Sequence, residues 1–288
     1  MNDDVDLNIN YLREWIGRTE TISDQITSVP IGALSATLDR NDPLPNSGDP
    51  LPPLWNWLYF LPLHRHSEIA GDGHAKRGGF LPPVSLPRRM FAGGRFQFHR
   101  PLRVGDHISR TSTIADVSYK EGRTGPLVFV AVRHEIKNGE VLALIEEHDI
   151  VYRGDSTGGS GNQKTQMAPS PAAWTREIQP DAVMLFRYSA LTFNGHRIHY
   201  DRKYATEVEG YPGLVVHGPL IATLLLDLLR RNLPDATVAR FAFRAVKPLF
   251  DIAPFSVCGR VEQDEKSIRL WASDMAGDLA MDATATLA

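Results

Sequence analysis

The chain has 288 residues, which is enough for one large domain or about two domains of ordinary size. Hydrophobic residues make up 42% and charged residues 23%, a balance typical of folded globular proteins that excludes global disorder. Lys and Arg number 31 against 34 Asp and Glu, so the formal charge of −3 provides no overall basic field for nucleic acid or an anionic membrane.

The N-terminus is acidic and lacks the basic start and apolar core of a targeting segment. The most apolar segment, residues 213–229, is interrupted by His217 and Asp227 and is shorter than the roughly 20 residues that a membrane-spanning helix needs. The single cysteine, Cys258, cannot form an intrachain disulfide, which favours a reducing compartment. We therefore expect a cytoplasmic protein that does not bind or cross a membrane.

The first half of the chain combines a weak helix signal with three strong strand signals. Apolar residues hint at a helix around 49–63. Residues 107–120, 125–138 and 139–153 then partly alternate apolar with polar side chains and are separated by glycine-bearing turns. This pattern predicts an antiparallel meander at the end of the first half.

A stretch rich in Gly, Ser and Pro follows at residues 154–171 and contains almost no large apolar side chain. Such a composition is typical of a flexible linker. We therefore predict an N-terminal domain of residues 1–153 and a C-terminal domain of residues 172–288.

The strongest helix signal lies in the second half, at residues 219–231. Pro219 suits a first helical position, and apolar residues occupy nearly every face, so the helix is expected to be buried. Leucines recur along it at helical spacing: Leu220, Leu224, Leu225 and Leu228. Strand patterns follow at residues 255–263, 267–274 and 279–287.

The two halves are similar in sequence. The segment RFQFH at residues 95–99 is echoed by RFAFR at 240–244, and a turn at Gly139 is echoed by one at Gly277 at nearly the same spacing. This self-similarity predicts a duplicated fold. A helix followed by a long antiparallel sheet in each half indicates an α+β architecture, with two antiparallel sheets that each wrap a central helix.

The residues best suited to chemistry lie between 191 and 219. Asn194 and two imidazoles, His196 and His199, are followed by Asp201, which we expect to be a helix N-cap. His217-Gly218 then begins the predicted buried helix. Free backbone N–H groups and the helix dipole at that point can bind a carbonyl oxygen that becomes negative during a reaction.

This arrangement resembles the signature of the MaoC-like hydratases of the hot-dog fold, Gly-Asp-x-Asn-Pro-x-His followed by a carboxylate and an alanine. His199 matches the signature histidine, Asp201 the carboxylate and Ala205 the alanine, while His217-Gly218 matches the His-Gly that opens the central hot-dog helix. From Trp55 onward the first half resembles the diverged half of double hot-dog members. These include hydroxyacyl-thioester dehydratase type 2 and the mesaconyl-CoA and itaconyl-CoA hydratases. Residues 1–50 add little to the resemblance.

The resemblance implies a double hot-dog protein that hydrates an enoyl thioester or, in reverse, dehydrates a 3-hydroxyacyl thioester. The expected substrate is an acyl-CoA or an acyl-carrier-protein thioester, for example a C5 dicarboxylic acyl-CoA such as mesaconyl-CoA or itaconyl-CoA. We expect one site per chain, because Asp72 and His74 of the first half are two residues apart rather than five. No cofactor, metal or nucleic acid is expected, and two such chains can form a homodimer.

The signature aspartate is replaced by Asn194 in this chain. In the family the Asp and the His together hold and activate the attacking water, and an asparagine can hold water but cannot take its proton. His199 is therefore the predicted sole general base, and the Gly218 N–H is the predicted donor to the enolate oxygen. The residues predicted to contact substrate are His196, Arg197, Tyr200, His217 and Arg89.

Other interpretations of these residues stay open. His196, His199, Asp201 and His217 can be considered as zinc ligands, but their spacing is loose and no cysteine supports them, so we predict no metal site. A basic cluster can bind coenzyme A phosphates or form a solvated surface: Lys76, Arg77, Arg88, Arg89, Arg95, Arg100 and Arg103. Two rival functions are a non-catalytic thioester-binding hot-dog protein and a hot-dog thioesterase.

Overall fold

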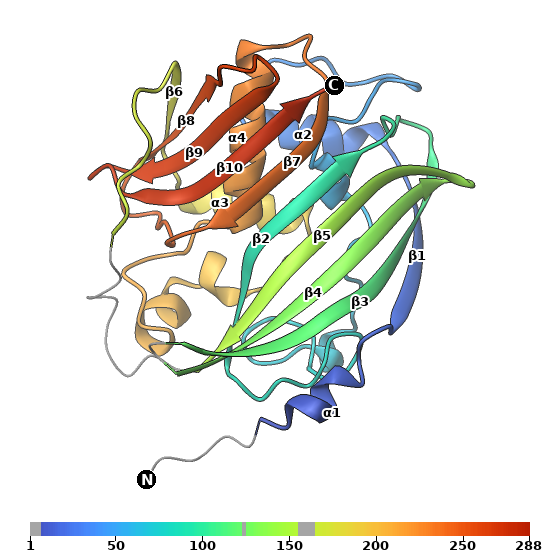
Figure 1. The fold of residues 1–288 in the computed structure, drawn as a ribbon, viewed down its shortest axis with the longest axis vertical. Helices are drawn as coiled ribbons and strands as arrows, with labels where there is room; N and C mark the ends of the chain where they lie inside the picture. The colour runs from blue at the N-terminus through green and yellow to red at the C-terminus, as the bar shows by residue number, and fades with distance from the viewer. Residues whose placement is uncertain (1–6, 123–124, 155–164) are drawn as a thin grey trace.

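A computed structural model describes residues 7–122, 125–154 and 165–288. The described residues form a ten-stranded antiparallel sheet in the order β1-β3-β4-β5-β2-β7-β10-β9-β8-β6, with α4, α2 and α3 behind the strands of its upper part in Figure 1. The N-terminal half contains α1 (Ile9–Arg13), β1 (Thr19–Gln25), α2 (Ser28–Thr37), the 3₁₀ turns η1 (Trp55–Leu58) and η2 (His66–Glu68), β2 (Arg88–Phe98), β3 (His107–Gly122), β4 (Gly125–Asn138) and β5 (Val141–Arg153). The C-terminal half contains β6 (Trp174–Ile178), α3 (Ala182–Leu191), η3 (Arg197–His199), η4 (Tyr204–Val208), α4 (Gly218–Asn232), β7 (Val238–Ala245), β8 (Phe255–Val261), β9 (Ser267–Asp274) and β10 (Leu279–Leu287).

The strand order is symmetric about the central pair β2–β7. These two strands carry the repeated sequence, and they pair with each other in antiparallel register, with Phe96 opposite Phe241 and Arg95 opposite Ala242. Each half therefore contributes five strands, and the two half-sheets join edge to edge. The predicted duplication is confirmed, and the strands expected within 107–153 and 255–287 all form.

Helix α4 is the centre of the C-terminal half, as the sequence predicts. Every residue from Leu220 to Leu229 is buried, and the helix packs against β8, β9, β10 and β6. Its leucines belong to one large apolar core that also contains residues of α2, η1 and β2. The two halves thus share a core, and α4 is held with its first turn in a fixed position.

The N-terminal half differs from the expectation of a helix around 49–63. Only the short turn η1 forms there, because Pro50, Pro52, Pro53 and Pro62 lack the N–H groups that a longer helix needs. The longest helix described in this half is α2, within the first 50 residues, to which the family resemblance assigned little. It packs against α3 of the other half.

The predicted linker lies mostly outside the described residues, since residues 155–164 are not described. At its described end Met167 forms a β-bridge with Asp278, so this end of the segment runs along the C-terminal half. The domain limits at 153 and 172 stay predictions. Within the described residues, none of the helices has the length and apolar character required to cross a membrane.

Candidate active site

His199, the signature histidine, is held in one orientation at the end of η3. Its Nδ1 lies 2.7 Å from the backbone oxygen of Val215, and the ring is buried. A carbonyl oxygen can only accept, so Nδ1 carries the hydrogen and Nε2 of the neutral ring carries a free lone pair. This is the tautomer that a general base requires.

Burial keeps His199 neutral. Removal from water lowers its pKa to about 4, the hydrogen bond to Val215 opposes this shift, and the charge of His74 adds to it. At neutral pH the ring is therefore ready to take a proton.

His217 connects the base to the first turn of α4. It is the N-cap residue of that helix, it stacks on His199 with 3.7 Å between ring centroids, and its Nε2 lies 2.8 Å from Oγ of Ser189. Its Nδ1 is buried and has no hydrogen-bond partner among the described residues. Burial places the pKa of His217 well below its usual value.

Gly218 follows His217 at the start of α4. A Cβ placed on Gly218 would meet no atom within 4 Å, so there is free space beside its backbone. The N–H groups of a 15-residue helix begin here, with the positive end of its dipole. The predicted oxyanion donor thus lies next to the predicted base.

Asn194 and Asp201 shape the loop that carries the histidines. The Oδ1 of Asn194 accepts from the backbone N–H of His196 at 3.0 Å. Asp201 accepts from the backbone N–H of Tyr204 at 3.0 Å, which is the capping contact expected from the sequence. The Asn194 oxygen is therefore already used within the loop.

Arg197 and Tyr200, both predicted to contact substrate, make structural contacts. The Arg197 guanidinium pairs with Asp201 at 2.8 Å, lies over the ring of Tyr204, and donates to the backbone oxygen of Gly71 at 3.0 Å. The half-exposed Tyr200 donates from its hydroxyl to the backbone oxygen of Gly195 at 2.9 Å. Arg197 thus ties this loop to the N-terminal half.

Asp72 and His74 join this site from the N-terminal half. The two rings of His74 and His196 are 4.0 Å apart between centroids, and His196 lies 5.5 Å from His199. Nδ1 of His74 donates to Oδ2 of Asp72 at 3.0 Å. Their two-residue spacing differs from the signature, so the motif did not predict their position beside His196.

Two glycines allow the halves to meet here. A Cβ on Gly73, which has a φ of +92°, would lie 1.8 Å from the backbone oxygen of Gly195, and a Cβ on Gly195 would lie 2.9 Å from that of Gly73. The backbone N–H of Arg197 donates to the oxygen of Asp72 at 2.9 Å. The dipeptide Gly-His occurs at both contact points, Gly73-His74 and Gly195-His196, and this repeat is the one sequence feature that could have indicated the contact.

Charge in the site is tuned by burial and by Arg89. Burial, His74 and His199 lower the pKa of His196 to about 2, with a smaller contribution from Arg89. The pKa of His74 is lowered by burial in spite of Asp72, and Arg89 lowers it further. Burial raises the pKa of Asp72, but the hydrogen bonds from His74 outweigh it and leave the pKa below its usual range.

Arg89 lies on β2 opposite Tyr152 of β5 and hydrogen-bonds with its side chain. The charge of Arg89 lowers the pKa of both His74 and His196. Two other members of the basic cluster have partners elsewhere. Arg95 pairs with Glu147 and Asp149, and Arg103 donates to the backbone oxygen of Gly48.

Three residues could hold a metal ion. Asp72, His74 and His196 each offer one ligand atom, and these atoms lie within 4.8 Å of one another. This set differs from the four residues considered from the sequence. The positive charge of Arg89 close to both histidines disfavours a divalent cation there.

A family model described as hydroxyacyl-thioester dehydratase type 2 matches residues 54–251. The chain belongs to this family. It is therefore a hydratase/dehydratase of acyl thioesters, a hydro-lyase, as the resemblance in the sequence implied. The Asn194–Gly218 segment lies within the matched residues.

Two relatives cover most of the chain. A protein of Chloroflexus aurantiacus named mesaconyl-C(4)-CoA hydratase is 48% identical over 273 residues, covering 95% of this chain and 96% of its own length. A mitochondrial hydroxyacyl-thioester dehydratase type 2 of Schizosaccharomyces pombe is 28% identical, covering 82% of this chain and 88% of its own.

Solved structures confirm the double hot-dog fold. HtdX of Mycobacterium tuberculosis aligns over 93% of this chain and 99% of its own, with a TM-score of 0.66 and 20% identity. A MaoC-like dehydratase aligns over 94% and 98%, with a TM-score of 0.70 and 14% identity. A further M. tuberculosis protein, described as a double hot-dog fold, has a TM-score of 0.58 and 14% identity, covering 94% of this chain and 96% of its own.

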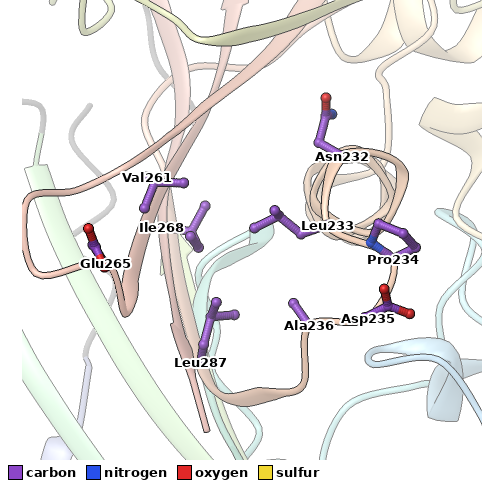
Figure 2. Close-up of a pocket in the computed structure, with 9 residues that line it drawn as sticks. All are labelled: Asn232, Leu233, Pro234, Asp235, Ala236, Val261, Glu265, Ile268 and Leu287. Atoms are coloured by element: carbon purple, nitrogen blue, oxygen red, sulfur yellow. The ribbon is translucent and has the colours of Figure 1, made fainter.

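The family site is distinct from a groove at the other end of α4, shown in Figure 2. This groove, of about 490 Å³, lies where α4 ends and contains no histidine. Since a helix rises 1.5 Å per residue, the groove is roughly 20 Å from Gly218. Its lining residues are Asn232, Leu233, Pro234, Asp235, Ala236, Val261, Glu265, Ile268 and Leu287. It lacks the paired histidines and the helix N-terminus of the candidate active site.

Proposed function

We propose that this protein hydrates a C5 dicarboxylic acyl-CoA of the mesaconyl-CoA or itaconyl-CoA type. The observation that carries the proposal is the arrangement of His199, which is a buried, neutral base with a free Nε2, stacked on the residue that caps α4. The relative named mesaconyl-C(4)-CoA hydratase supports the substrate class.

In the proposed reaction the thioester oxygen accepts from the Gly218 N–H. Nε2 of His199 takes a proton from water while the water oxygen bonds to the β-carbon of the enoyl group. The electron pair of the double bond moves toward the thioester, and the negative charge that develops there is stabilised at the first turn of α4. The proton on His199 then passes to the α-carbon, so that atoms balance without a co-reactant. Asn194 keeps His196 and the loop in place.

Arg89 supplies the specificity for a second carboxylate. A guanidinium near the reacting groups can pair with the free carboxylate of a dicarboxylic acyl chain, while an aliphatic chain leaves it unpaired. His196 and His217 complete the predicted contacts, and the unpaired Nδ1 of His217 is suited to such a contact. Arg197 and Tyr200 support the same loop.

We also propose a cellular compartment, an assembly and an acyl carrier for this protein. The protein acts in the cytoplasm, which agrees with its free, buried Cys258. It forms a homodimer of double hot-dogs. The acyl group is carried by coenzyme A rather than by a carrier protein, since the substrate in the name of the 48% identical relative is a CoA thioester.

The test follows the enoyl-thioester absorbance with mesaconyl-CoA, itaconyl-CoA and crotonyl-CoA. We expect the wild-type chain to remove the band, and His199→Asn to slow it by at least about 100-fold, because asparagine keeps a donor for Val215 but lacks the base. Arg89→Met should lower kcat/KM for the dicarboxylic substrates by about 10- to 100-fold and leave crotonyl-CoA nearly unchanged.

Three results would contradict the proposal. Release of free thiol would identify a thioesterase, binding without either reaction would identify a thioester-binding protein, and full activity of His199→Asn would remove the base from the mechanism. An equal effect of Arg89→Met on all three substrates would remove its role in specificity.

A further inference from the structure

The turn that carries Asp72 and His74 is built into the active site. Residues 69–75 form a tight hairpin, closed by a β-bridge between Ile69 and Ala75. The hairpin is fixed to the histidine loop through the backbone contact of Asp72 with Arg197, the guanidinium contact of Arg197 with Gly71, and the close approach of Gly73 to Gly195. Such a dense set of contacts holds the side chains of this turn in place beside His196.

The residues described so far leave the role of the signature carboxylate, which helps to hold the attacking water, without a group to fill it. The family signature places a carboxylate at the position of Asn194, and the Asn194 oxygen is engaged with the His196 backbone. Asp72 brings a carboxylate to the same group of histidines from the other half. It holds Nδ1–H of His74, so Nε2 of that ring has a free lone pair, as Nε2 of His199 does.

We propose that the Asp72–His74 pair is the second water-holding group of this hydratase, in the role that the signature aspartate plays elsewhere in the family. This inference rests on the proposed hydration reaction and assigns one more catalytic residue to it. His74 contacts the water, and Asp72 is a positioning residue that acts through His74.

In this scheme the attacking water donates one hydrogen to Nε2 of His199 and the other to Nε2 of His74. The hydrogen on His199 is removed as the carbon–oxygen bond forms, and it is later delivered to the α-carbon. The hydrogen held by His74 stays on the oxygen and becomes that of the product hydroxyl. Asp72 fixes the tautomer of His74, as carboxylates do for catalytic histidines. His196 contacts both rings, with its centroid 4.0 Å from that of His74 and 5.5 Å from that of His199.

The experiment measures kcat and KM for hydration of an enoyl-CoA by His74→Asn, His74→Ala and Asp72→Asn. We expect kcat to fall by at least about 100-fold in His74→Asn, which keeps a donor toward Asp72 but lacks Nε2, with KM changed by only a few fold. Added imidazole should restore part of the rate of His74→Ala. His66→Ala, on an exposed turn of the same half, is the control and should behave as wild type.

The outcomes separate this inference from the proposed function. A wild-type chain that hydrates no enoyl thioester would overturn both, whereas an active wild type with unaffected His74 variants would overturn only this one. A rise in KM with unchanged kcat, or no rescue by imidazole, would overturn the inference and show that the turn has only a structural role. Loss of wild-type activity in EDTA and its return with Zn²⁺ would overturn the inference in favour of a metal site.

Discussion

The two halves of the molecule share a fold but contribute different things to the site. In the C-terminal half α4 provides ten consecutive buried residues and an open first turn at Gly218. In the N-terminal half the prolines of residues 50–62 leave only η1 in the segment where a central helix was expected. One half therefore supplies the helix end and His199, and the other supplies Asp72, His74 and Arg89. Under the proposed mechanism, the duplicated fold divides one reaction between its two copies.

The halves also stabilise their central segments differently. Helix α4 satisfies its own backbone, whereas η1 is held by the buried carboxylate of Glu146, which accepts from Nδ2 of Asn56 at 3.0 Å and from Nε1 of Trp57 at 2.6 Å. Burial opposes ionisation of Glu146, but the neighbouring His148 and the other donors outweigh it and lower the pKa to about 2. A buried carboxylate thus holds the central segment of the N-terminal half in place, whereas helical hydrogen bonds hold that of the C-terminal half.

The largest expected effect comes from breaking the ionic contact that joins the halves at α4. The side chain of Asp227 is almost fully buried and binds Arg40 of the N-terminal half at 2.7 Å, together with Arg176 and Arg231. Asp227→Asn should lower the free energy of unfolding by about 3 kcal/mol, because it leaves three cations without their shared anion. Urea unfolding measures this. Asp235→Asn, exposed just after α4, is the control, and a change below about 1 kcal/mol would show that the two halves do not depend on this contact.

The next largest effect is expected from a substitution that disturbs the contact between the two halves at the active site. Gly73→Ala places a methyl group where only 1.8 Å is available and adds the cost of a positive φ. We expect hydration to slow by about 100-fold, since a displacement of about 1 Å of a catalytic turn can cost that much. Gly71→Ala is the matched control, because a Cβ there meets nothing within 4 Å. Equal rates for both variants would show that docking of the turn is not required.

A smaller effect is expected in the pH dependence of stability, to which a buried histidine of each half contributes. Burial lowers the pKa of His199 to about 4 and that of His134 to about 3, while an unfolded histidine titrates near 6.5. Below pH 6.5 the unfolded chain binds more protons, so the stability that these neutral rings provide is complete above 6.5 and falls as the pH drops. Each ring contributes a slope of about 1.4 kcal/mol per pH unit.

Urea unfolding between pH 7 and 5 tests this slope in His199→Asn and His134→Asn. Each variant should show a weaker dependence on pH than the wild-type chain. An unchanged slope in either variant would mean that the ring it removes is not held neutral in the folded state.

Most of the C-terminal half could be predicted from the sequence because its signals are local. The leucine spacing of α4, the alternation in β8 to β10 and the motif around His199 each lie within one segment. In the N-terminal half β1 and α2 carried no such signal. No residue of β1 is fully buried, so it shows no apolar face, and α2 contains Pro30 and Gly32, which are poor helix formers.

The composite part of the site could not be predicted for a different reason. Asp72 and His74 are more than a hundred residues from His196 in the chain, and their spacing gives no information on which surface the turn meets. That contact depends on the edge-to-edge joining of the half-sheets and on two facing glycines, Gly73 and Gly195. The position of Gly218 at the start of α4 could be predicted, because His217-Gly218 lies in a segment that resembles the family.

The pairing of β2 with β7 at the centre of the sheet would be lost if the two halves were expressed as separate chains. Each half on its own would present a long strand edge with unpaired N–H and C=O groups and an aromatic row that includes Phe96 or Phe241. Such edges recruit other strands, so separately expressed halves are expected to self-associate or aggregate rather than remain as monomers. Covalent linkage keeps the two complementary edges at a high effective concentration, which favours their pairing within one chain over association between chains.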